Sequence, residues 1–366
     1  MMSRNSLVPV YFLYLCTINL NINMPQNKTR IIQFEVLRVI AAFAVVMLHT
    51  TAQRFNESFL STEWDIRNLY DSFVRWSVPI FVMISGALFL DSKKIINVKT
   101  LYSKNIARLF FILVLWSIIY GVDNGLRGYG FSSLASRIIQ GPVHLWFLKM
   151  LIGLYIAVPI LRAVVTDAKL ERYFLCVSFV FIYFIPMLFP LLKEELRNLF
   201  ENVYQSFEIK TVSGYAGYFV LGHYLANNAV RKTTKTIIYV LGLLSPVAVC
   251  FLTRSLSIHD GAPNLLYYEN INLFTLFESV AIFLFVNNKK IASKYHPFIL
   301  FASKLSLGIY IIHPLILNHY YDICSMRMVS SHPLVFLPID AILIFMVSLL
   351  VTLLLSRIPY IRKIVT

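Results

Sequence analysis

The stretch from Arg30 to Thr50, RIIQFEVLRVIAAFAVVMLHT, combines an apolar helical run with three ionisable side chains, Glu35, Arg38 and His49. A charge inside a bilayer costs about 2.5–3.5 kcal/mol on insertion scales, so such groups usually face a bundle interior or a wet cavity. Glu35 and Arg38 are three residues apart and Arg38 and His49 are eleven apart, which places all three on one helix face. The arginine and the histidine are then separated by roughly 16 Å along the axis.

Histidine is the commonest general acid or base, and a fixed arginine binds carboxylate or phosphate. Together, Arg38 and His49 suit group transfer from an anionic donor on one side of the membrane to an acceptor reached from the other. We therefore expect both side chains to face a shared hollow that connects the two sides. The alternative is a salt-bridged arginine and an unrelated histidine at the far interface.

The second apolar run, DSFVRWSVPIFVMISGALFL, carries Asp71 and Arg75 four residues apart, a spacing that lets them pair on a helix. Pro79 frees a backbone carbonyl, and Gly86 allows another helix to approach closely. Arg75 is a candidate for the catalytic or acceptor site. The alternatives are an arginine that extends to the interface, and a proline and a glycine that serve only packing and a kink.

Two further span boundaries carry candidate binding residues. Lys104 and Arg108, in LYSKNIARLFF, are four apart and could clamp donor phosphates; the alternative is the ordinary excess of basic residues on the cytoplasmic side. His144 and Trp146 open the run HLWFLKMLIGLYIAVPILR and are acceptor-site candidates, although tryptophan is also common there as an interface anchor. Lys149 lies about one turn further into the same run.

Two late runs carry buried polar candidates. Glu278 lies near the middle of LFTLFESVAIF, where a carboxylate needs a partner or a role, and either intramembrane arginine could be that partner. In SKLSLGIYIIHPLIL, Ser303, Ser306, Tyr310 and His313 are spaced 3, 4 and 3 residues apart and form one polar stripe on a helix. The alternative for the histidine is a core residue bonded to a carbonyl that the following proline frees.

Composition places these residues in a membrane. The chain of 366 residues is 58% hydrophobic and 15% aromatic, and its apolar residues fall in long runs, as in a polytopic membrane protein. Its net charge of +15 comes from short clusters between those runs, which argues against a nucleic-acid partner. The sequence contains no CxxC pair, HExxH pattern, P-loop or GxSxG elbow, so we expect neither a metal nor a bound cofactor.

The pattern predicts an all-α bundle of about ten transmembrane helices. Each apolar run approaches the ~20 residues that a bilayer requires. We expect spans at about 32–50, 69–90, 106–123, 143–162, 173–192, 213–228, 237–254, 270–287, 298–318 and 336–356, the sixth being the shortest.

Lysine and arginine concentrate on alternate connections between these spans, so the positive-inside rule predicts that both termini are cytoplasmic. Arg38 would then lie toward the cytoplasmic end of the first span and His49 toward its outer end. Residues 1–23 contain an apolar segment too short to span a bilayer, and we expect a leader or upstream extension there. Residues 24–366 would form a single membrane domain.

Several of these segments together resemble the membrane acyltransferase-3 family, particularly its surface-polysaccharide O-acetyltransferase branch. The most specific match is an arginine followed after ten residues by a histidine in the first helix, here Arg38 and His49. Two features depart from the pattern: the family's common aspartate three residues before the arginine is Glu35 here, and the leader at 1–23 is unusual. The further matches follow in order: RWSVPIFVMISGALFL (75–90), KNIAR (104–108), HLWFLKMLIGLYIAVPIL (144–161), GYFVLGHYL (217–225) and SLGIYIIHPL (306–315).

The resemblance implies that an acyl group, usually acetyl, moves from cytoplasmic acyl-coenzyme A to a sugar hydroxyl of a surface or lipid-linked polysaccharide. It implies that His49 is the base or an acyl relay, and that Arg38 orients the donor or stabilises the thioester oxyanion. Lys104 and Arg108 match the family's basic segment and would bind coenzyme A phosphates. Acetyl-coenzyme A would be a substrate, and the protein would lie among the lipids of the inner (plasma) membrane.

Two other classes of protein share some of these features. A glycan or small-acid transporter could use the same polar stripe as a path, but the sequence has no clear repeat and no paired broken helices. A structural or sensor protein would have little use for an arginine and a histidine inside the membrane. An enzyme would label the glycan from acetyl-coenzyme A, whereas an exporter would move it unlabelled.

Overall fold

The computed structural model describes residues 31–129, 138–324 and 332–366, and every regular element in these ranges is helical. This confirms the predicted all-α class, whereas the predicted leader at 1–23 lies outside the described residues. Labels with η mark 3-10 or π-helical segments. The elements are α2 (Ile32–Ala52), α3 (Thr62–Ser72), α4 (Ser77–Phe89), α5 (Val98–Thr100), η1 (Leu101–Ile106), α6 (Ala107–Asn124), η2 (Gly125–Tyr129), η3 (Val143–Leu145), α8 (Trp146–Thr166), α9 (Ala168–Val177), η4 (Ser178–Phe184), η5 (Ile185–Leu191), α10 (Glu194–Ser206), α11 (Ile209–Asn227), α12 (Lys232–Asp260), η6 (Leu266–Tyr268), α13 (Leu273–Asn287), η7 (Ser293–Tyr295), α14 (His296–Cys324), α15 (Pro333–Ser356) and α16 (Pro359–Val365).

Helical stretches long and apolar enough to cross a membrane make the chain a multi-pass membrane protein. Within the described ranges there are nine: Ile32–Ala52, Thr62–Phe89, Val98–Arg127, Ile138–Thr166, Ala168–Leu191, Lys232–Asp260, Leu266–Asn287, Ser293–Ile323 and Pro333–Ser356. The predicted span at 213–228 corresponds to α11, whose helical geometry is interrupted at Gly214 (φ −15°, ψ −110°). This segment is the shortest of the ten predicted spans, and it is not among the nine stretches above.

The second span is a broken helix rather than a continuous one. A turn joins the end of α3 to the start of α4, and Arg75 lies in that turn. Pro79 occupies the first turn of α4, where its ring would clash with the carbonyl of Arg75 if the helix continued backwards. The proline therefore places an intramembrane arginine on irregular backbone, which a membrane tolerates where protein or water surrounds it.

Two glycines bring α4 and α11 into backbone contact. A Cβ atom at Gly86 would lie 1.8 Å from the carbonyl oxygen of Phe219, and one at Gly222 would lie 2.0 Å from that of Met83. Any larger residue at either position would force the helices apart. The close approach expected at Gly86 is therefore confirmed.

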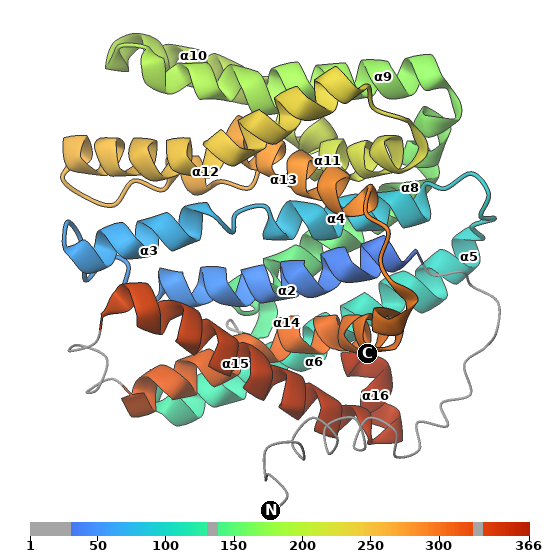
Figure 1. Ribbon diagram of the computed structural model, residues 1–366, viewed down its shortest axis with the longest axis vertical. Helices are drawn as coiled ribbons and strands as arrows, with labels where there is room; N and C mark the ends of the chain where they lie inside the picture. Colours follow the sequence, from blue (N-terminus) through green and yellow to red (C-terminus); the bar gives the residue numbers. More distant parts are fainter. Residues whose placement is uncertain (1–30, 130–137, 325–331) are drawn as a thin grey trace, which may run out of the picture. The chain divides into compact units, whose positions relative to one another are not determined.

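Helix α2 lies between α4 and α14 (Figure 1) and also packs against α3, α13 and α15. Side chains near both ends of α2 meet α14: Glu35 contacts Ser303, and the ring of His49 lies beside that of His313. Both pairs advance along the sequence in the same order, so the two helices run in the same direction. This pairing sets where the candidate site lies.

Candidate active site

Three histidines from three separate elements converge at one end of α2. His49 is on α2, His144 is on η3, and His313 is on α14. The ring centroids of His49 and His313 are 5.1 Å apart, and those of His144 and His313 are 6.3 Å apart. His313 is fully buried and His144 is 8% exposed, whereas His49 is half-buried. The structure thus unites three residues that the sequence analysis proposed separately.

Two tyrosines hold this cluster in place. The Tyr310 hydroxyl donates to the backbone carbonyl of His144, and the Tyr120 ring lies 4.7 Å from that of His144. The Tyr120 hydroxyl donates to the carbonyl of Ile311 (2.8 Å) and accepts from the amide of Leu315 (3.1 Å). The Tyr120 hydroxyl therefore bridges the Ile311 carbonyl and the Leu315 amide of α14. Pro314, which follows His313 inside this helix, is a residue at which helices commonly kink.

The cluster contains ring nitrogens that are available for chemistry. Nε2 of His144 and Nε2 of His313 are buried and have no hydrogen-bond partner among the residues that the structure describes. Buried polar atoms are nearly always paired, so two open nitrogens in one cluster indicate a functional role. Within the same ranges, no group of three or more His, Cys, Asp or Glu side chains is arranged to hold a metal ion.

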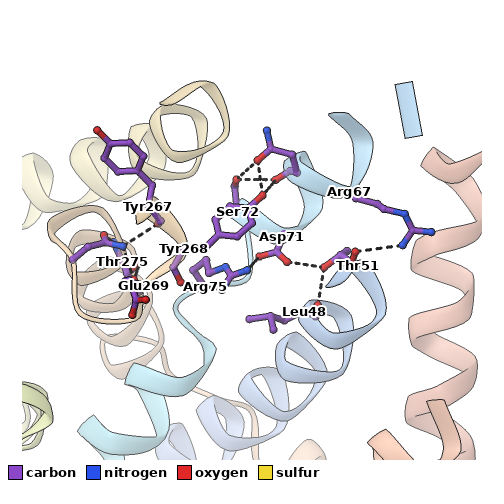
Figure 2. A network of polar contacts seen from close by, with 12 residues as sticks. Leu48, Thr51, Arg67, Asp71, Ser72, Arg75, Tyr267, Tyr268, Glu269 and Thr275 are labelled. Atoms are coloured by element: carbon purple, nitrogen blue, oxygen red, sulfur yellow. Dashed lines mark hydrogen bonds and ion pairs between the residues drawn. The ribbon is translucent and has the colours of Figure 1, made fainter. Parts of the chain in front are cut away.

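A polar network runs from the end of α2 to the broken second span (Figure 2). The Thr51 hydroxyl bonds to Oδ2 of Asp71 (3.1 Å) and to the carbonyl of Leu48 (2.8 Å). Asp71 forms an ion pair with Arg75, as their four-residue spacing predicted. Nη1 of Arg75 donates to the carbonyl of Tyr268 (2.9 Å), and its guanidinium lies 4.0 Å from the centre of that ring.

A buried arginine fixes the backbone that follows His49. Nη1 of Arg67 donates to the carbonyls of Thr50 and Thr51, both at 3.3 Å, and its Nη2 pairs with Glu63 at 2.6 Å. A cation at these orphan carbonyls also complements the negative end of the helix dipole. Arg67 and the Asp71 network therefore hold the turn of α2 that presents the imidazole of His49.

A cavity of about 300 Å³ opens beside this end of α2. Its wall begins at Ala52, one turn beyond His49, and includes the buried ion pair of Asp71 and Arg75. The remaining lining residues are Arg54, Phe55, Asn56, Glu57, Leu265 and Tyr268. The mixture of aromatic rings, amide and charged groups suits a small polar ligand.

At the opposite end of α2, Arg38 forms an ion pair with Glu35. Its Nη1 lies 2.9 Å from both carboxylate oxygens of Glu35. Glu35 also accepts from the hydroxyl of Ser303, and the Ser306 hydroxyl donates to the carbonyl of Ser303 (2.8 Å). The side chain of Arg38 is 28% exposed, so this arginine remains accessible from one side.

Tyr155 on α8 connects this arginine with the predicted donor-binding segment. The Tyr155 hydroxyl is close enough to Arg38 and to Arg108 for both charges to act on it, and it forms a hydrogen bond with Ser85. Arg108 and Lys104 are both exposed, and the lysine lies in the π-helical segment η1. Such segments are frequent at functional sites. The three cations predicted to contact the donor therefore belong to one end of the bundle.

The hollow expected between Arg38 and His49 is not seen among the described residues. The same helix face carries Ala41, Ala42 and Val45 between them, and all three are buried. Ala41 and Val45 belong to the main apolar core. Packed hydrocarbon therefore separates the two polar ends of α2 in this conformation, although the intervening side chains are small.

The other candidates lie around this framework. Both carboxylate oxygens of Glu278 are buried without a hydrogen-bond partner among the described residues, and Arg75 is the cation whose charge acts on them. Trp146 is half-buried, with its ring 5.6 Å from that of Tyr215. Lys149 bonds to the backbone carbonyl of Gln140. Glu278 is therefore within range of the charge of Arg75 but has no polar contact among the described residues, whereas Trp146 and Lys149 have structural partners.

Sequence reasoning missed Tyr120, Tyr155, Arg67 and a buried pair between His223 and Glu171, whose atoms lie 2.8 Å apart. The tyrosines carry no signal of their own, because the chain has 21 tyrosines and 29 phenylalanines spread through its apolar runs. The remaining three are ionisable groups beside or within apolar runs, and that placement was the available signal.

The helices long and apolar enough to cross a membrane place this chain in the class of integral-membrane proteins. A family model described as an acyltransferase domain matches residues 31–359. The chain therefore belongs to the acyltransferase-3 family and is a membrane acyltransferase. Comparison with curated proteins and with solved structures finds no significant match.

Proposed function

We propose that this membrane acyltransferase moves an acetyl or related acyl group from cytoplasmic acyl-coenzyme A to a hydroxyl of a surface or lipid-linked polysaccharide. The observation that carries the proposal is the division of α2 into two polar ends. Arg38 and nearby cations occupy one end, and the half-buried imidazole of His49 joins the histidine cluster at the other. The protein would act in the inner (plasma) membrane with both termini in the cytoplasm.

The donor would bind at the end of α2 that holds Arg38. Exposed Lys104 and Arg108 suit the phosphates of coenzyme A, because a cation near an anionic phosphate forms a charge-assisted contact. Oxyanion donors act within about 3 Å of the reacting oxygen. Arg38 lies roughly 16 Å along the helix from His49, so we assign it to orienting the donor rather than to stabilising the oxyanion.

The transfer step would take place at His49. One ring nitrogen removes the proton of the acceptor hydroxyl, and the oxygen forms a bond to the thioester carbonyl carbon. The carbon–sulfur bond then breaks, and the coenzyme A thiolate leaves and takes up the proton from the imidazolium. The thioester arm would reach this point along the small side chains Ala41, Ala42 and Val45, which requires that packed face of α2 to open.

The acceptor would enter through the cavity beside Ala52. Its aromatic and polar lining suits a sugar ring, since Phe55 and Tyr268 offer apolar surface and Asn56 and Glu57 offer hydrogen-bonding groups. The buried pair of Asp71 and Arg75 forms part of its wall. Through the Thr51 hydroxyl, this pair is linked to the backbone carbonyl of Leu48, the residue before His49.

Incubation of membranes with radiolabelled acetyl-coenzyme A tests the proposal. Wild-type membranes should transfer label to the glycan fraction, and His49→Ala membranes containing the same amount of protein should not. His259→Ala is the matched control, because its side chain is 85% exposed and forms an ion pair only with the neighbouring Asp260 among the described residues. Export of unlabelled glycan by the wild type would favour a transporter instead.

A further inference from the structure

The tautomer of His313 follows from its hydrogen bond. Nδ1 of His313 lies 3.1 Å from the backbone carbonyl oxygen of Ile309. A carbonyl oxygen can only accept a hydrogen bond, so Nδ1 carries the hydrogen. In the neutral ring the other nitrogen, Nε2, is then left with a lone pair and can act only as an acceptor.

The lone pair on Nε2 has no partner among the described residues, although the ring is fully buried. The titratable groups around it come from three other elements and from α14 itself. They are His49 on α2, His144 on η3, Tyr120 on α6 and Tyr310 on α14.

Three of these neighbours are less suitable partners than His49. The hydroxyl of Tyr310 donates to the carbonyl of His144, and that of Tyr120 donates to the carbonyl of Ile311. The ring of His144 is 6.3 Å from that of His313, whereas the ring of His49 is 5.1 Å away. His49 is therefore the nearest imidazole able to supply an N–H.

We propose that His313 is a positioning residue for His49, whose N–H it accepts through Nε2 during the reaction. This inference rests on the proposed function of His49 as the base. The hydrogen bond would fix the tautomer of His49, so that its other nitrogen presents a lone pair to the acceptor hydroxyl. Catalytic hydrogen bonds often tighten only when substrate is bound, and the centroids of these two rings are already 5.1 Å apart.

The proton taken from the acceptor hydroxyl is returned to the leaving group within the same step. As His49 removes the hydroxyl proton with one nitrogen, its positive charge is shared with His313 through the N–H bond between the rings. The proton that His49 has gained then passes to the departing thiolate, and both rings return to the neutral state. The role of His313 resembles that of a carboxylate behind a catalytic histidine, but it adds no charge to the buried site.

Two amide variants separate the roles of the two ring nitrogens. His313→Asn keeps a donor near the position of Nδ1 for Ile309 but has no atom near Nε2. His313→Gln reaches the position of Nε2 with an oxygen that can accept the N–H of His49. We expect His313→Gln to keep kcat within about tenfold of wild type, and His313→Asn to lower it by about a hundredfold or more. Because the donor binds elsewhere, KM for acetyl-coenzyme A should stay unchanged in both.

The assay uses the full-length protein in membranes that contain its own glycan acceptor. A His313→Asn variant as active as His313→Gln, or more so, would mean that only the anchor to Ile309 matters and would overturn the proposal. Absence of label transfer by the wild type would instead refute the proposed function.

A measurement on the wild-type protein covers the case in which neither variant folds. Solid-state nitrogen NMR of the histidine-labelled protein in lipid should show His313 protonated at Nδ1 and unprotonated at Nε2. The opposite tautomer at His313 would overturn the proposal without any variant.

Discussion

The two ends of α2 meet the same neighbour, α14, in different ways. At one end the carboxylate of Glu35 accepts hydrogen bonds from the Arg38 guanidinium and from the Ser303 hydroxyl, so it has one charged and one neutral donor. At the other end the rings of His49 and His313 lie side by side, and Nε2 of His313 has no partner among the described residues. A satisfied ion pair holds a fixed charge, whereas an open nitrogen can exchange a proton. This contrast supports our proposal that the donor binds at the first end and that proton transfer takes place at the second.

The largest loss of stability is expected when the buried ion pair of Asp71 and Arg75, near the His49 end of α2, is broken. Asp71 is 1% exposed and Arg75 is 13% exposed, so Arg75→Leu would leave a buried carboxylate unpaired. Removing one partner of a buried pair costs about 3–5 kcal/mol. Thermal unfolding in detergent should show a matching loss of stability.

The double variant Asp71→Leu/Arg75→Met is the control for that prediction. Replacing both partners with apolar residues is often nearly neutral, so most of the stability should return. If the double variant is as unstable as Arg75→Leu, the ion pair is not what holds this end of the bundle.

The donor end should respond through binding rather than through the rate of transfer. Arg38→Gln removes the positive charge that we propose binds the donor. A hydrogen bond to a charged group contributes about 1.5–3 kcal/mol. KM for acetyl-coenzyme A should therefore rise about tenfold to a hundredfold, with a smaller change in kcat. A normal KM combined with a strongly reduced kcat would place Arg38 at the reacting carbonyl instead.

A smaller effect is expected at the exposed cation of the donor segment. Lys104→Ala should weaken acetyl-coenzyme A binding by about 1 kcal/mol or less, and the difference should shrink as salt rises. Lys232→Ala is the matched control, because this lysine is also exposed and begins a different helix, α12. Equal effects of the two substitutions would indicate a general surface charge rather than a donor site.

Local spacing predicted the parts of this structure that depend on one helix. The pairing of Asp71 with Arg75 and the shared stripe of Ser303, Tyr310 and His313 follow from residues three, four or seven apart. Pro79 predicts a kink in this span, but the sequence does not predict that Arg75 lies in the turn between α3 and α4.

The convergence of the histidines could not be predicted in the same way. His49, His144 and His313 come from elements separated by about a hundred residues or more, and only packing brings them together. The insertion of the Tyr120 hydroxyl into α14 likewise depends on how two distant helices pack. The closed face at Ala41 and Val45 departs from the expected hollow, because small apolar residues allow close packing as readily as they line a passage.

The most direct test of the division between the two ends measures donor binding and label transfer on the same preparations. For His49→Ala we predict acetyl-coenzyme A binding within about twofold of wild type, together with transfer to glycan reduced by about 10²–10⁴-fold. Arg38→Gln should show the opposite pattern, with weakened binding and transfer that recovers at high donor concentration. Retained transfer by His49→Ala, or a loss of donor binding equal to that of Arg38→Gln, would contradict the account.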